Sequence, residues 1–139
     1  MSQTIRINTH GNPMPEQHGD WIDLSAAEDV SMRRGEFRII SLGVSMELPN
    51  GMYAMVVPRS STFKNHRILL ANSVGIIDNE YCGDNDVWGF PAIAMQDTII
   101  RKGTRIAQFK LMHSGEDVRF EQVESLGNHD RGGFGSTGK

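Results

Sequence analysis

The chain of 139 residues is long enough to bury one hydrophobic core, and nothing in its composition calls for a second domain. Its formal net charge of −3 argues against a surface that binds nucleic acid through many phosphate contacts, and no apolar run approaches the roughly 20 residues of a membrane helix. The single cysteine, Cys82, excludes an intrachain disulfide and is expected to be a small half-buried side chain. The first residues lack the pattern of a signal peptide, so we expect a cytoplasmic protein.

Short apolar stretches separated by turn residues predict many short strands in a sandwich or barrel. Apolar residues occupy every second position at Leu42, Val44, Met46 and Leu48, which predicts a strand with one buried face. The following Pro-Asn-Gly predicts a turn and therefore a hairpin with a strand over residues 52–57. We expect further strands at 36–40, 68–71, 74–77, 87–94, 98–100 and 105–112, a turn at 101–103, and one short helix at 60–65.

The composition changes at Gly127, after which Phe134 is the only apolar side chain other than glycine. Residues 127–139 therefore read as an arm, which is either a disordered tail or a segment that folds over a bound anion. The last seven residues match the start of the phosphate-loop pattern GxxxxGK[ST]. Such a loop must open a helix, and the sequence stops at Lys139, so this pattern does not predict a P-loop NTPase.

Three other segments carry polar groups, and each has an ordinary structural interpretation. In PRSST, at 58–62, Ser60 or Ser61 would cap the short helix. Asp78 would be a turn aspartate after a buried Val-Gly-Ile-Ile strand, and Asp23 would be a polar residue near the end of a strand. Taken singly, none of these segments predicts an activity.

Taken together, their order and spacing resemble the five motifs of the trimeric dUTPase family. The similarity is closest to the branch found in Gram-positive bacteria and their phages, and it spans nearly the whole chain. The segments that carry it are DLSAA from Asp23, PRSS from Pro58, GIIDNEYCGD from Gly75 with Asn72 before it, RIAQ from Arg105, and RGGFGSTG from Arg131.

The resemblance implies an all-β, distorted jelly-roll or β-sandwich barrel over residues 1–126, with one short helix and a flexible phosphate-binding arm over 127–139. It also implies a homotrimer with shared active sites that hydrolyses dUTP to dUMP and pyrophosphate with Mg²⁺. In that reaction Asp78 is the general base, and Asp23 contacts the metal through water. The phosphates are then bound by Arg59, Ser60, Ser61 and Gln108, and by Arg131, Gly135, Ser136 and Thr137 of the arm.

The same resemblance implies a uracil pocket lined by Asn72, Gly75 and Ile77, with Tyr81 packed beneath the deoxyribose. The family stacks an aromatic residue of the arm on the uracil, which here is Phe134. The family usually has glycine where this chain has Ser61, and two more residues before that phenylalanine. Because of the shorter spacing, we also considered Trp88 or Phe90 as the stacking surface, with core packing as the alternative.

Three other functions are open at this level. A dCTP deaminase resembles the same fold and trimer, but the segment around Asp78 and the complete arm favour hydrolysis of the triphosphate. A regulatory protein partner is compatible with the sequence if the chain is phage-encoded. A generic β-sandwich binding module leaves the spacing of the five motifs unexplained.

Overall fold

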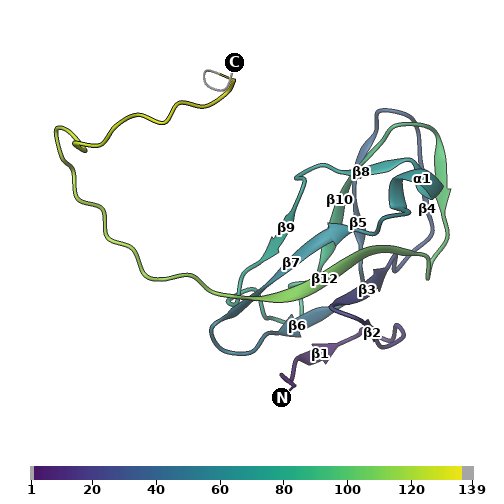
Figure 1. Cartoon of the computed structure of the whole chain (residues 1–139). Helices are drawn as coiled ribbons and strands as arrows, with labels where there is room; N and C mark the ends of the chain where they lie inside the picture. The colour runs from purple at the N-terminus through teal and green to yellow at the C-terminus, as the bar shows by residue number, and fades with distance from the viewer. Residues whose placement is uncertain (1, 136–139) are drawn as a thin grey trace.

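The structure is a computed structural model that describes residues 2–135. It is built almost entirely from short strands, as the sequence predicts, and it contains one short helix (Figure 1). No helix in this part of the chain is long and apolar enough to cross a membrane. The elements are β1 (Arg6–Asn8), β2 (Gln17–His18), β3 (Trp21–Ser25), β4 (Val30–Met32), β5 (Phe37–Ser41), β6 (Ser45–Glu47), β7 (Met52–Pro58), α1 (Thr62–His66), β8 (Ile68–Leu70), β9 (Gly75–Ile77), β10 (Gly89–Ala94), β11 (Thr98–Ile100) and β12 (Arg105–His113).

The strands form antiparallel sheets that enclose a single hydrophobic core. The largest sheet has the order β2-β3-β12-β7-β9, and a three-stranded sheet has the order β5-β10-β8. Two further pairs, β1-β6 and β11-β4, complete the sandwich. The all-β prediction is confirmed, although the described strands do not close into a barrel.

The predicted hairpin between residues 42–48 and 52–57 is wrong. Leu42, Val44, Met46 and Leu48 are all buried, as their spacing predicts, but only residues 45–47 form a strand. That strand, β6, pairs with β1, whereas β7 pairs with β12 and β9. The turn exists, since the Met52 amide donates to the Pro49 carbonyl at 3.2 Å, but it carries the chain from one sheet into another.

The core contains both aromatic residues that the sequence offered as a stacking surface for uracil. Trp88 and Phe90 are 1% and 0% exposed, so neither can stack on a ligand in this structure, and that hypothesis is wrong. The Trp88 ring packs edge-on against Phe109, with ring centroids 5.0 Å apart and an interplanar angle of 77°. Trp88, Phe90, Ala92 and Ala94 alternate along the chain, and all four point into the core.

Two smaller expectations about burial also differ from the structure. β9 lies at the edge of the five-stranded sheet, so Val74 and Ile76 are exposed rather than part of a buried strand. Cys82 follows in a loop and is exposed rather than half-buried.

The segment after β12 leaves the body of the molecule (Figure 1). It has no regular structure, and every described residue from His113 to Gly135 is exposed. Val118, Phe120, Leu126 and Phe134 are apolar side chains on this segment, and Phe120 is 93% exposed. The exposed segment therefore begins before Gly127, where the composition changes.

The burial of Trp88 leads to a test of the core. We expect Trp88→Ala to lower the free energy of unfolding by about 3–5 kcal/mol, because it removes a large buried ring and leaves a cavity. Phe134→Ala should leave it within about 0.5 kcal/mol, because that ring is fully exposed. Urea denaturation of both variants at equal protein concentration measures the difference, and equal stabilities would contradict the core assignment.

Candidate functional site

A carboxylate held between two arginines lies at one end of the five-stranded sheet. Asp23 on β3 is directly opposite Gln108 on β12. Its Oδ1 lies 3.3 Å from Arg59 Nε, and its Oδ2 lies 3.2 Å from Arg105 Nη1. Both carboxylate oxygens are therefore engaged, and the cluster keeps an excess of positive charge. Such a cluster suits a phosphate group, which guanidinium groups bind well.

The turn that carries Arg59 is attached to β12 by a buried hydroxyl. Thr62 is 1% exposed; its Oγ1 accepts a hydrogen bond from the Arg59 amide at 3.0 Å and donates one to the Ile106 carbonyl at 2.8 Å. Gln108 reaches the same turn, because its Nε2 lies 3.4 Å from the Pro58 carbonyl. The main chain around Arg59 is thereby held beside the strand that carries Gln108.

The helix that follows this turn, α1, begins at Thr62, two residues later than the predicted start at Ser60. Ser61 is the N-cap residue of α1, yet its side chain makes no capping hydrogen bond. Ser60 is exposed. Both serines follow Arg59 in the chain. Because the Ser61 hydroxyl makes no capping hydrogen bond, it is left for another partner.

His66, at the end of α1, belongs to the same region. Burial and the positive charge of Arg59 lower the pKa of His66 from its ordinary value of 6.5. The neutral imidazole is therefore favoured in the folded protein. No pattern in the sequence points to His66, because the histidines are scattered along the chain.

A second group of predicted residues surrounds β9. The Asp78 carboxylate follows this strand and is exposed, and its Oδ2 accepts the Glu80 amide at 3.0 Å. The Tyr81 amide donates to the Asp78 carbonyl at 3.0 Å, which closes a tight turn. Tyr81 is 42% exposed, and its hydroxyl lies 3.4 Å from the Val87 carbonyl. An Asp side chain that caps its own turn in this way has a fixed orientation.

The residues predicted to line a uracil pocket lie along the same segment. Gly75 and Ile77 belong to β9, and Asn72 is exposed in the turn before it. A Cβ on Gly75 would lie 3.2 Å from the Val56 Cβ, so glycine permits the close approach of β9 to β7. The pocket residues and Asp78 are thus brought together by one short strand and its flanking turns.

One chain does not bring the two groups together. Ile77 is opposite Ala54 in the β7 ladder, so Asp78 lies beyond the Ala54 end, whereas Arg59 follows Pro58 at the other end of β7. The five residue-to-residue steps from Ala54 to Arg59 correspond to about 17 Å of extended chain. Arg131, Phe134 and Gly135 lie on the exposed arm, and Ser136 and Thr137 lie outside the described residues.

The side chains near Asp23 restrict how a metal ion could bind. The described part of the chain has no group of three or more His, Cys, Asp or Glu side chains that could hold a metal. Asp23 is a single carboxylate already paired with two arginines. This set does not suit a cage made only of protein ligands, but it fits Mg²⁺ that keeps several waters and takes phosphate oxygens.

Sequence reasoning missed three residues that organise these groups. Arg105, Thr62 and Asn79 all lie within the segments quoted above, but the sequence assigns none of them a role. Arg105 and Thr62 act through contacts with residues far away in the chain, at Asp23 and Ile106. No local pattern reports such contacts, so the sequence contains little signal for them.

The Thr62 contacts lead to a test of the turn. We expect Thr62→Val to lower the free energy of unfolding by about 1–3 kcal/mol, because it leaves the Ile106 carbonyl and the Arg59 amide without their buried partner. Thr62→Ser keeps the hydroxyl and should lose clearly less. Chemical denaturation compares the two, and a valine variant at least as stable as the serine variant would refute this role.

The His66 environment leads to a prediction about pH. The unfolded chain binds a proton at His66 more readily than the folded protein, so this residue contributes stability that is lost as the pH falls below its ordinary value of 6.5. We expect His66→Gln to lose less thermal stability than the parent between pH 7.5 and pH 5.5. His129→Gln, on the exposed arm, is the control and should behave like the parent. An identical pH dependence in all three proteins would rule out the prediction.

Comparisons with known proteins identify the family of the chain. The dUTPase family model matches residues 13–138. The SPbeta prophage-derived deoxyuridine 5'-triphosphate nucleotidohydrolase YosS of Bacillus subtilis is 57% identical over 122 residues, which cover 88% of this chain and 86% of that protein. This similarity confirms the predicted branch of Gram-positive bacteria and their phages.

Solved structures show the same fold at low sequence identity. A mutant of the phage 80alpha dUTPase, described for the link between enzymatic activity and SaPI inducing capacity, has a TM-score of 0.80 and 21% identity, covering 99% of this chain and 100% of that chain. A mutant dUTPase from phage phi11 of S. aureus, described as coordinating a structural Mg(II) ion, has a TM-score of 0.76 and 18% identity, covering 88% and 98%. The jelly-roll prediction is confirmed by this likeness. Because the dUTPase family model matches residues 13–138, which is most of this chain, the chain belongs to the dUTPase family.

Proposed function

We propose that this chain hydrolyses dUTP to dUMP and pyrophosphate, with water attacking the α-phosphorus and Asp78 as the general base. The observation that carries the proposal is the match to the dUTPase family over residues 13–138, which includes every motif quoted above. The reaction keeps dUTP out of DNA synthesis and supplies dUMP for thymidylate.

The contacts of Asp78 suit a general base. Its Oδ2 is occupied by the Glu80 amide, so Oδ1 is the oxygen left to accept a proton from water. The water oxygen then forms a bond to the α-phosphorus, the bond from that phosphorus to the bridging oxygen breaks, and pyrophosphate leaves. The fixed turn holds the carboxylate, so little reorganisation is needed at the moment of attack.

The arginine cluster supplies charge for the triphosphate. Arg59 and Arg105 exceed the charge of Asp23, and the hydroxyls of Ser60 and Ser61 and the amide of Gln108 are hydrogen-bond donors nearby. Mg²⁺, when bound, would neutralise charge that develops on the phosphates, and Asp23 would contact its water shell. The arm, over residues 127–139, would add Arg131, Gly135, Ser136 and Thr137 to the phosphates.

Selection of uracil and deoxyribose belongs to the β9 segment. Asn72, Gly75 and Ile77 would pair with the uracil edge, so cytosine would leave buried polar groups unpaired, a mismatch that can discriminate by about 10⁴-fold. Tyr81 beneath the sugar would exclude a ribose hydroxyl. Phe134 is the remaining candidate for stacking on the base, because it is fully exposed whereas Trp88 and Phe90 are buried.

The separation along β7 supports a homotrimer with shared sites. Asp78 and Arg59 lie toward opposite ends of that strand, so a complete site needs the base half of one chain and the phosphate half of another. Exposed apolar residues also indicate a surface that contact with another subunit would bury. Phe37, Ile93 and Leu69 are in register on one face of the three-stranded sheet, and the first is 57% exposed.

Complementation tests the shared site directly. We expect Asp78→Asn and Arg59→Ala each to lose turnover of dUTP. Mixed subunits should then recover activity, because about one quarter of the sites in a random 1:1 assembly combine an intact Asp78 with an intact Arg59. Release of pyrophosphate after refolding the two together measures the recovery, and an inactive mixture would argue for sites within single chains.

The substrate is tested by the same readout with Mg²⁺ and dUTP, dTTP, dCTP or UTP. We expect fast release from dUTP alone. Release from all four would indicate a broader pyrophosphatase, and ammonia released from dCTP would indicate a deaminase instead.

A regulatory protein partner is a second proposal, supported by the identity of 57% to a prophage-derived relative and by the fold shared with a phage dUTPase that has SaPI inducing capacity. It is compatible with catalysis. An inactive wild-type protein with an intact fold would make it the leading function.

A further inference from the structure

We infer that Asn79 is a positioning residue for the general base, a role that rests on the proposed function of Asp78. The Asn79 Nδ2 donates to the Pro49 carbonyl at 2.9 Å and to the Met52 carbonyl at 2.8 Å. These carbonyls stand at the two ends of one tight turn. Both hydrogens of the side-chain amide are therefore used on a segment about 30 positions earlier in the chain.

These two hydrogen bonds form a clamp, which acts where the pairing of β9 with β7 stops. The last residue of β9 in the ladder is Ile77, which pairs with Ala54. Beyond it the chain from Asp78 to Tyr81 is exposed or half-buried, and its internal hydrogen bonds fix its shape but not its place on the body. The Asn79 side chain supplies that attachment immediately beside the general base.

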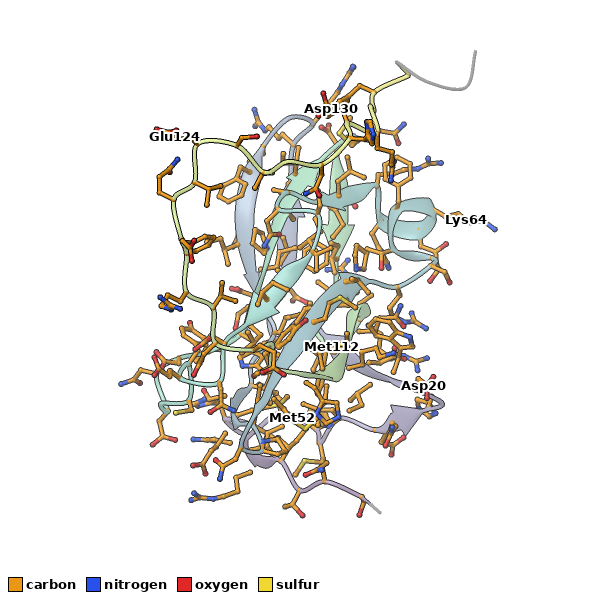
Figure 2. The ribbon with its side chains drawn as sticks, turned by 60° about the vertical axis from the view of Figure 1, so that its left-hand side comes forward. Asp20, Met52, Lys64, Met112, Glu124 and Asp130 are labelled. Carbon is orange, nitrogen blue, oxygen red and sulfur yellow. The ribbon has the colours of Figure 1, made fainter. Side chains whose placement is uncertain are left out.

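The turn that receives these bonds is itself firmly held. The Met52 amide donates to the Pro49 carbonyl at 3.2 Å, and the Ser114 amide donates to the Gly51 carbonyl at 2.8 Å. Met52 also pairs with His113 at the end of β12, and Figure 2 shows Met52 close to the labelled Met112 of that strand. Asn79 thus connects the loop of the base to the paired ends of β7 and β12.

The chemistry of the contact selects a side-chain amide. Asp at this position would present only acceptor oxygens to two carbonyls when ionised, although it has nearly the same shape. Alanine would leave both carbonyls without the donor, whereas serine would keep one donor on a shorter side chain. A displacement of about 1 Å of a catalytic group can reduce turnover about 100-fold without contact to substrate.

The test measures kcat, KM for dUTP and thermal stability for Asn79→Asp, Asn79→Ala and Asn79→Ser. We expect Asn79→Asp and Asn79→Ala to lower kcat at least about 10-fold while KM changes less than about threefold. Asn79→Ser should recover part of the kcat. For Asn79→Asp, the loss should diminish at low pH, where the introduced carboxyl is protonated and can donate one hydrogen bond.

Asn85→Asp is the matched control. Asn85 is exposed in the same loop, and its replacement adds the same charge without removing the clamp. It should keep the parent kcat; an equal loss in this control would show that charge alone acts, and would overturn the inference. Parent kcat in all Asn79 variants, or a loss confined to thermal stability, would also overturn it. Asp78→Asn is measured in parallel: if it remains active, the assignment of the base fails, and if it is inactive while the Asn79 variants are normal, only the positioning role fails.

Discussion

Pairing of β7 with two partners is the constraint on which the rest of the structure depends. β7 is bonded to β12 on one side and to β9 on the other. The first pairing sets Gln108 and the arginine cluster near the end of β7 at Pro58, and the second sets Asp78 toward the opposite end. A strand is nearly inextensible. The distance between the proposed phosphate-binding half and the proposed base half is therefore a fixed property of the fold, which is why the proposed function includes assembly with other copies of the chain.

The two halves are also held by different kinds of interaction. The arginine cluster is organised by charge around Asp23 and by the buried hydroxyl of Thr62. The proposed base half is organised by hydrogen bonds to main-chain groups, with Asp78 capping its own turn and Asn79 attaching that turn to the body. Positive charge is concentrated at the proposed phosphate site, and the proposed general base is kept apart from the arginines within one chain.

Much of the fold could be predicted from local patterns, because alternation of apolar residues reports which face of a strand is buried. This succeeded for β10, β11 and β12, and for the four buried positions from Leu42 to Leu48. It failed for the partner of β6, because alternation says nothing about which strand lies alongside. For Trp88 and Phe90 the sequence left base stacking and core packing as alternatives, and the structure shows that both residues point into the core. In the candidate site, the motifs identified the residues at both ends of β7, whereas Thr62, Arg105 and Asn79 act through long-range contacts that have no local signature.

The exposed arm has a thermodynamic consequence for the order of events. In this structure the residues after His113 are all exposed as far as the description extends, so closing the arm over a ligand would restrict backbone that is otherwise loosely held. Ordering costs about 1–2 kcal/mol of conformational entropy per residue, and glycines, frequent after Gly127, lose the most. In the proposed reaction, an intact triphosphate would contact several parts of the arm at once and would offset this cost. After cleavage, pyrophosphate and dUMP would each hold only part of the arm, and the recovered entropy would favour opening and departure of the products.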